Sequence, residues 1–338
     1  MQPDNGQRVS FGIRLANSGP LASPAAMFSL ARRSEQRGFD SVWVHDHVSW
    51  ARDRIKHFSV GAIEACAEQD PAFFESVTTV AAVGAVLERA RVGIAGLALP
   101  LRDPRILAKQ VASVDTMLGG GRLVLAVGVG SQPEDFRVMG VPWQRRGRIT
   151  NDYLGALRAI LHSTGPVDFV SEAVSFERGT FQPGGPGVEI WVAASSAAGI
   201  ARAARLGDGW LTAAQSVDSY AAAARDWRSA IEHAGRDPAT LTAAYEAFAC
   251  IKENHEEAVR AAEASLTQMY GGLAEGLERT IVGEPEACIE RLRQLIDHGA
   301  RFFELRLISR STAEMEEMVD LVAETILPAF GTTPAAAG

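Results

Sequence analysis

The sequence predicts an α/β protein of the (β/α)8, or TIM-barrel, class with a hairpin insertion near the carboxyl-terminal mouth. Short apolar runs rich in β-branched residues alternate with amphipathic helical stretches along the chain. About eight such runs occur, whereas a doubly wound sheet normally has fewer strands and changes direction partway. The length of 338 residues is that of one large barrel.

The predicted strands are short and strongly apolar. The run SVWVH at 41–45 has the continuous apolar character of a parallel strand that is buried on both faces. Strands are expected at 9–15, 41–45, 92–98, 123–127, 189–193, 209–213, 243–251 and 302–307.

The predicted helices fill the intervals between these strands. After Pro104, which suits a first helical turn, apolar residues recur at spacings of three and four and so share one face. Helices are expected at 24–37, 71–89, 104–118, 146–161, 197–206, 217–233, 255–270, 285–298 and 313–327.

The segment from about 163 to 187 interrupts the alternation. It is rich in Gly and Pro, and it contains two short alternating runs at 167–170 and 174–176. We therefore expect a hairpin that folds over one mouth of the barrel, inserted in a single domain spanning 1–338.

Composition excludes several classes of protein. The formal net charge is −8 and the basic residues are scattered, which argues against binding to nucleic acid. The polar segment 1–10 and the absence of a long apolar stretch predict a cytoplasmic protein without a membrane span. Cys66, Cys250 and Cys288 lie far apart, so we expect buried thiols rather than disulfides or zinc ligands.

Chemistry in such a barrel is expected in the loops that follow the strands. The first of these loops holds His45, Asp46 and His47, followed by Trp50. Two imidazoles and a carboxylate are suited to acid and base catalysis. Alternatively, Asp46 caps the loop and the histidines are polar groups satisfied at the rim. No HExxH or comparable pattern supports a metal site.

Three further loops contain glycines or small hydroxylated residues. Gly96 and Leu97 end the third strand, where a glycine allows another group to approach the backbone. Close packing within the barrel would explain a glycine at this position equally well. The other two loops contain Gly128, Val129, Gly130 and Ser131, and Ala194, Ser195 and Ser196. The former suits a planar ring, a phosphate or a tight turn, and the latter suits an anion or an ordinary helix cap.

Four long segments carry a resemblance to a known family. They are GFDSVWVHDH at 38–47, RDPRILAKQVASVDTMLGGGRLVLAVGVG at 102–130, IWVAASSAAGIARAARLGDGWL at 190–211 and VGEPEACIERLRQLIDHGARFFEL at 282–305. In this order they resemble the luciferase-like monooxygenase superfamily, whose bacterial barrel enzymes use FMN or the deazaflavin coenzyme F420.

The resemblance implies a cofactor that lies across the carboxyl-terminal mouth. His47 would contact its ring or move protons, and Asp46 would lie beside the ring's reactive edge. A non-prolyl cis peptide bond is implied at Gly96–Leu97, beneath the ring. By the same resemblance, the ring or its polyol tail would be bordered by Gly128, Gly130 and Ser131, and the phosphate would be held by Ala194, Ser195 and Ser196.

The resemblance favours F420 over FMN. Two features favour F420: the Asp46-His47 pair, and Val129, which stands where luciferase-type FMN enzymes carry a phosphate-binding Arg. Against it, Ser131 stands where some F420 dehydrogenases carry a catalytic Glu. We expect hydride transfer between F420 and a small unphosphorylated substrate, with Trp50 near that substrate.

Two other functions remain open. The first is an FMN-dependent monooxygenase that uses O2, and the second is a non-catalytic flavin-binding barrel. A homodimer is expected by family resemblance.

Overall fold

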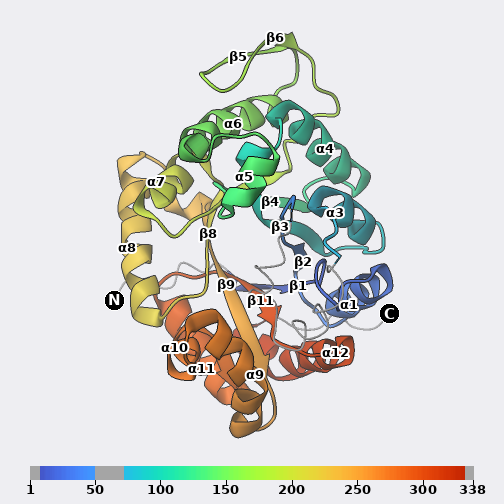
Figure 1. Ribbon diagram of the computed structural model, residues 1–338, viewed down its shortest axis with the longest axis vertical. Helices are drawn as coiled ribbons and strands as arrows, with labels where there is room; N and C mark the ends of the chain where they lie inside the picture. Colours follow the sequence, from blue (N-terminus) through green and yellow to red (C-terminus); the bar gives the residue numbers. More distant parts are fainter. Residues whose placement is uncertain (1–7, 50–71, 332–338) are drawn as a thin grey trace.

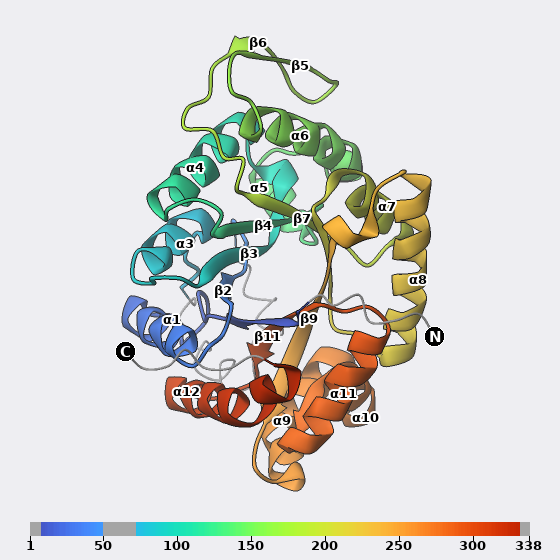
Figure 2. The same cartoon turned by 180° about the vertical axis from the view of Figure 1, so that it is seen from behind.

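Eight parallel strands form a closed barrel in the part of the chain that the structure describes, residues 8–49 and 72–331 of a computed structural model. The neighbours around the barrel are β1, β2, β3, β4, β7, β8, β9 and β11, and β11 pairs back to β1. Figure 1 shows the helices as an outer ring around these strands, and Figure 2 shows the same arrangement from behind. The predicted TIM barrel is therefore confirmed.

The strands agree with the predicted ones to within a few residues. They are β1 (Ser10–Arg14), β2 (Ser41–Val44), β3 (Arg91–Ala98), β4 (Leu123–Gly128), β7 (Glu189–Ala193), β8 (Gly209–Thr212), β9 (Thr242–Ile251) and β11 (Phe302–Leu307). A short strand that the sequence did not predict, β10 (Ile281–Gly283), pairs with β9 outside the barrel.

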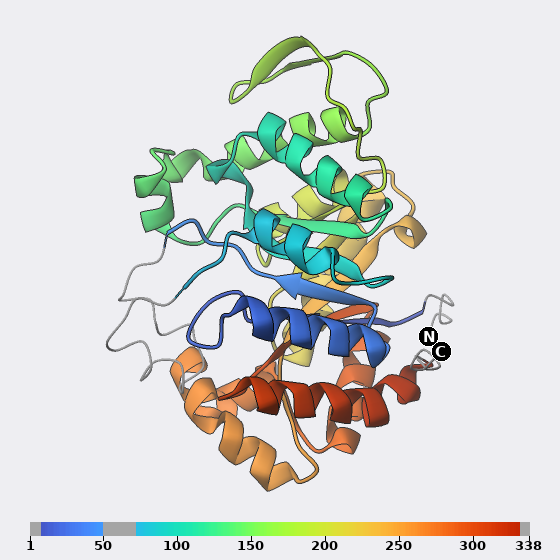
Figure 3. The same ribbon diagram turned by 90° about the vertical axis from the view of Figure 1, so that its right-hand side faces the viewer.

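The helices follow the strands in the expected alternation. They are α1 (Pro24–Gln36), α3 (Ser76–Gly84), α4 (Pro104–Met117), α5 (Pro133–Val138), α6 (Arg146–Leu161), α7 (Ala197–Leu206), α8 (Val217–His233), α9 (His255–Tyr270), α10 (Leu273–Arg279), α11 (Pro285–Asp297) and α12 (Thr312–Leu321). The sequence did not predict α5 or α10. In the side view of Figure 3, α5 lies beyond the carboxyl ends of the strands, at the end we call the mouth.

Aromatic rings fill the interior of the barrel below the mouth, toward the amino-terminal ends of the strands, which we call the lower interior. Trp43, Trp191 and Phe302 pack together with ring centroids 5.1–5.4 Å apart. Glycines on the neighbouring strands make room for Trp43, because a Cβ added to Gly12 or Gly93 would lie within 2.5 Å of its indole. These rings separate the mouth from a hollow at the amino-terminal end of the barrel, which Trp43, Trp191 and Phe302 help to line.

The predicted hairpin is present, but it does not cross the mouth. Strands β5 (Val167–Val170) and β6 (Ser175–Gly179) pair antiparallel. They lie along the outer surface of α6, where the Phe169 ring packs against Gly155 (Figure 1). The turn reaches the beginning of α6, where the Ala173 amide donates to Asp152. The aromatic contact with α6 holds the hairpin beside the helix layer.

Two of the three cysteines lie within the described residues. Cys250 and Cys288 are buried free thiols, as predicted, and burial raises their pKa to about 11 and about 12. Cys66 lies outside the described residues. Within residues 8–49 and 72–331, every helix is too short or too polar to span a bilayer.

Candidate active site

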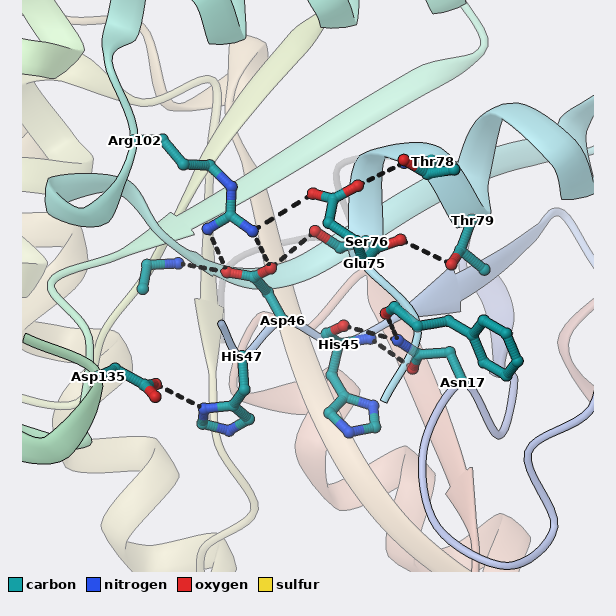
Figure 4. A network of polar contacts seen from close by, with 12 residues as sticks. Asn17, His45, Asp46, His47, Glu75, Ser76, Thr78, Thr79, Arg102 and Asp135 are labelled. Carbon is teal, nitrogen blue, oxygen red and sulfur yellow. Dashed lines mark hydrogen bonds and ion pairs between the residues drawn. The ribbon is translucent and has the colours of Figure 1, made fainter. Parts of the chain in front are cut away.

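The loop after β2 brings three predicted site residues to the mouth. Its backbone is held by Asn17, whose amide accepts from the His45 N–H at 3.1 Å and donates to the His45 carbonyl at 2.9 Å. Figure 4 shows Asp46 directed at Arg102 and Ser76, His47 directed at Asp135, and the backbone of His45 bonded to Asn17. The three residues are adjacent in sequence, but the structure assigns them different environments.

Asp46 is a buried carboxylate with a full set of donors. It is 4% exposed, and Arg102 binds both of its oxygens, at 2.6 and 2.8 Å. Ser76 Oγ donates to it at 2.7 Å, and the Ala98 N–H at 3.1 Å (Figure 4). Asp46 thus fixes the end of β3 and the beginning of α3 rather than presenting an open carboxylate to the mouth.

His47 is the exposed imidazole of the loop. Its side chain is 21% exposed, and its Nδ1 lies 3.2 Å from Oδ2 of Asp135, a buried residue of α5. The other oxygen of Asp135 accepts from the Ser49 N–H at 3.1 Å. The ring edge also meets Phe73, with centroids 5.5 Å apart. His47 is therefore oriented by a carboxylate and still reaches the mouth.

His45 is held in the neutral form. Burial, together with the nearby charges of Arg14 and Arg306, lowers its pKa well below the usual range for histidine. Its Nε2 lies 2.9 Å from Ser18 Oγ, while its buried Nδ1 has no hydrogen-bond partner among the described residues. His45 lines a cavity of ≈ 670 Å³, a volume that includes the open solvent at its entrance. The buried Nδ1 is therefore a polar atom that the described residues leave unsatisfied.

The same cavity has a charged wall from β1, β9 and β11. Arg14 forms ion pairs with Glu304 and with Glu246, the latter at 3.0 Å. These carboxylates raise the pKa of Arg14 although burial opposes its charge. Arg306 lies over the Phe248 ring at 4.7 Å, and burial lowers its pKa to about 10. This side of the mouth is polar, and its charges are largely balanced.

The opposite side, from β3, β4 and β7, has almost no side chains. Gly96 is exposed in the middle of the barrel wall, and a Cβ there would lie 2.9 Å from that of Ala193. A Cβ on Gly128 would also face Ala193, at 3.9 Å. The mouth therefore has one smooth wall of backbone and small residues facing one polar wall.

The cis peptide bond implied for the end of β3 is present one residue earlier than expected. It joins Ala95 to Gly96, not Gly96 to Leu97. The register with β4 shifts between Ala95 and Leu97, and this shift turns the Leu97 side chain outward into the fully buried layer between barrel and helices. Only the backbone of Leu97 is close to the mouth.

The loop after β4 is shaped by Gly130. Its φ is +78°, and a Cβ there would lie 2.6 Å from the Phe136 ring. Glycine is the residue that tolerates both the left-handed backbone and this close contact. Ser131 follows it and is exposed.

The loop after β7 leads into α7. Ser196 is the N-cap of α7, since its Oγ accepts from the Gly199 N–H at 3.3 Å. Ser195 and Ser196 are exposed and Ala194 is half-buried. Gly199 fits beneath the loop, because a Cβ there would lie 2.5 Å from that of Ala194. The exposed hydroxyls stand at the positive end of the helix dipole, which suits an anion.

Sequence reasoning identified the loops but missed most of the partners. Arg102, Asp135 and Glu304 had no local signal, because each contacts a residue distant in the chain. Within the described residues, no group of three or more His, Cys, Asp or Glu side chains is arranged to hold a metal ion. Trp50 lies outside the described residues.

The site therefore combines a smooth wall suited to a planar ring, an anion-accepting helix end, an oriented imidazole, and a mostly apolar cavity that Arg14, His45 and Arg306 also line. This arrangement can bind a flat, phosphate-bearing cofactor and exchange a proton with a molecule beside it.

Comparisons with known proteins identify the family. Residues 8–279 match the luciferase-like monooxygenase family. An uncharacterized protein of Mycobacterium bovis is 30% identical over 186 residues, which are 54% of this chain and 63% of that protein. The 4-hydroxyprotoasukamycin monooxygenase of Streptomyces nodosus is 25% identical, over 96% of this chain and 93% of its own.

Among solved structures, an F420-dependent secondary alcohol dehydrogenase in complex with an F420–acetone adduct has the same fold. Its TM-score is 0.80 at 18% identity, and the alignment covers 96% of this chain and 99% of that one. The chain belongs to the luciferase-like monooxygenase family.

Proposed function

We propose that this chain is an F420-dependent oxidoreductase that transfers a hydride between the deazaflavin and a small unphosphorylated organic substrate. The observation that carries the proposal is the division of the mouth into a smooth wall, made of Gly96, Gly128 and Ala193, and a polar wall that faces it. An oriented imidazole, His47, lies at the same end of the barrel.

The residues of the smooth wall fit a flat ring. Gly96 is exposed although it lies within a barrel strand, so its backbone borders the opening. A side chain at Gly96 would meet Ala193 and occupy the space beside the wall. Ser195 and Ser196, with the first N–H groups of α7, would hold the phosphate. Bound F420 would supply the hydride or accept it.

The chain's own residues would handle the proton. When an alcohol is oxidised, an imidazole nitrogen of His47 takes the hydroxyl proton, and in the reverse direction it returns that proton to the carbonyl oxygen. His45 stays neutral and lines the cavity beside the mouth. Asp46 acts as a positioning residue, because Arg102 and the end of β3 occupy its oxygens.

A second candidate function is an FMN-dependent monooxygenase that uses O2. The 25% identical monooxygenase of Streptomyces nodosus, aligned over 96% of this chain, favours it. Val129 favours F420, because it stands where luciferase-type FMN enzymes carry a phosphate-binding Arg. The two functions differ in whether O2 is consumed.

Cofactor binding is tested first. The purified chain is incubated separately with F420 and with FMN, desalted, and examined by absorbance and thermal unfolding. We expect F420 to be retained and to raise the Tm. Retention of FMN with O2 uptake by its reduced form would favour the monooxygenase, and retention of neither would favour a non-catalytic barrel.

Catalysis is tested with propan-2-ol and acetone as first probes, followed by a panel of larger alcohols and ketones. We expect cofactor reduction by an alcohol, or the reverse with a ketone, measured by the absorbance of F420. His47→Ala should retain F420 and lower turnover by about 100-fold or more, because a general acid–base group contributes about that much. The exposed His162→Ala is the control. Unchanged turnover in His47→Ala would remove His47 from the mechanism.

A further inference from the structure

We propose that Asp135 is the positioning residue of His47: it holds the imidazole in the Nδ1–H tautomer and in one orientation, so that Nε2 is the nitrogen that exchanges the proton with the substrate. The catalytic part of this proposal rests on the proposed function, whereas the tautomer is a property of the chain alone. Asp135 lies in α5, a helix that the sequence pattern did not reveal.

The two oxygens of Asp135 have separate partners. Oδ2 lies 3.2 Å from His47 Nδ1, and Oδ1 accepts from the Ser49 N–H at 3.1 Å. Asp135 thus binds the loop after β2 at two points, one on the side chain of His47 and one on the backbone two residues later. The bond from the Ser49 N–H holds the backbone of the loop against α5, and the contact with Nδ1 holds the His47 ring against the same carboxylate.

The burial of the Asp135 carboxylate indicates that it has a specific partner. Asp135 is 3% exposed. A buried carboxylate is costly unless donors surround it. Among the described residues, the ion pair recorded for Asp135 is the one with His47. By contrast, the neighbouring buried carboxylate, Asp46, is paired with an arginine. Asp135 is therefore placed opposite a histidine, whereas Asp46 is placed opposite an arginine.

The geometry has a definite consequence for the proton. A carboxylate accepts and does not donate, so the nitrogen that faces it carries the hydrogen. With Nδ1–H directed at Asp135, neutral His47 has its lone pair on Nε2. The carboxylate also stabilises the imidazolium that forms when Nε2 takes a proton. A base oriented by a third group is the arrangement that general-base catalysis uses.

The tautomer is tested by NMR on protein labelled with 15N-histidine, with His47 assigned from a His47→Gln sample. We expect the Nδ1–H tautomer in the wild-type chain and a mixture of tautomers in Asp135→Asn, because the amide can present its NH2 group to the ring. Asp152→Asn is the control, since that carboxylate accepts from the Ala173 N–H. An Nε2–H tautomer in the wild type, or no change in Asp135→Asn, would overturn the proposal.

The catalytic part is tested by a double-mutant cycle. Asp135→Asn should lower kcat by about 100-fold while the Kd for F420, measured by fluorescence titration, stays within about threefold. In the His47→Ala background the same substitution should have no further effect, because Asp135 acts through His47.

Equal losses in both backgrounds would show that Asp135 does not act through His47. If Asp135→Asn is poorly folded, Asp135→Glu serves in its place, and recovery of both the tautomer and turnover supports positioning. If the wild-type chain turns over no probe with F420, the proposed function fails, whereas the NMR result still decides the tautomer.

Discussion

At the scale of single residues, adjacent side chains in this protein have different tasks because their partners come from different strands and helices. Asp46 is neutralised by Arg102, which binds it with two parallel hydrogen bonds. Such a bidentate pair holds both side chains in a fixed orientation. His47, one residue later, faces a carboxylate instead and keeps one edge at the mouth. In this loop, the role of each side chain depends on the residue that it contacts and not on its residue type alone.

His45 predicts how stability depends on pH. Burial keeps its folded-state pKa below that of the unfolded chain, so the unfolded state binds a proton more readily. Stability is therefore unaffected above about pH 6.5 and falls as the pH decreases below it, by at most about 1.4 kcal/mol per pH unit.

Urea unfolding of the wild type and His45→Gln between pH 7.5 and 5.5 measures this effect. We expect the variant to lose less stability over that interval, while the exposed His162→Gln behaves like the wild type. Identical slopes for wild type and His45→Gln would show that folding leaves the pKa of His45 unchanged.

At the scale of secondary structure elements, short connections decide what reaches the mouth. The turn at Gly130 directs the chain from β4 into α5 and places Phe136 against the glycine. The same turn carries Asp135 toward the loop after β2. A six-residue helix has too few apolar positions to show a period, and so α5 was not predicted.

Two glycines with left-handed backbones allow two free-energy costs to be compared: the cost of that backbone conformation in an L-residue, and the cost of a steric contact made by the added Cβ. Gly130 and Gly140 have φ of +78° and +68°, but an added Cβ meets Phe136 only at Gly130. Gly140→Ala should lose about 1–2 kcal/mol, the cost of a left-handed L-residue. Gly130→Ala should lose more, because Phe136 must also move.

The free energy of unfolding in urea, measured for both variants, gives the comparison. Equal losses would mean that Phe136 relaxes freely. We also expect Gly130→Ala, but not Gly140→Ala, to weaken F420 binding, since the turn borders the mouth.

At the scale of the whole molecule, the interior of the barrel is divided between a packed aromatic layer and a mouth lined by charged and small residues. Trp43, Trp191 and Phe302 occupy the lower interior, and glycines on adjacent strands leave the space that the indole of Trp43 needs. The upper interior instead carries charged residues on one side and small residues on the other. The position of the site follows from this division.

The fit around Trp43 is testable. A Cβ on Gly93 would lie 2.2–2.4 Å from the benzene part of the Trp43 indole. Gly93→Ala should therefore destabilise the chain by about 1–3 kcal/mol, as overpacking does. Trp43→Phe removes those ring atoms, so the double variant should lose clearly less than the sum of the two single losses.

Gly165→Ala, where an added Cβ meets nothing within 4 Å, is the control for these unfolding measurements. Strict additivity of Gly93→Ala and Trp43→Phe would contradict direct contact.

Much of the fold and part of the site could be predicted from the sequence. The barrel strands were found because a buried parallel strand and an amphipathic helix each leave a pattern within about ten residues. The hairpin left the same kind of signal, but its position on α6 depends on Phe169 meeting Gly155, which no local pattern records. The cis peptide bond was expected at Gly96–Leu97 and lies at Ala95–Gly96, because the register shift in β3 is set by its pairing with β4.

The amino-acid sequence by itself determined the fold class, the order of its elements, and the loops after β2, β3, β4 and β7 where the site lies. Tertiary structure decided what those loops contain: Asp135 faces His47 from 88 positions away, Arg102 meets Asp46 across 56, and Glu304 pairs with Arg14 across 290. Secondary structure arises from neighbours along the chain, and a pattern in the chain reveals it. Charge pairing and the space beside a glycine depend on neighbours across the barrel, which exist only once the barrel has closed.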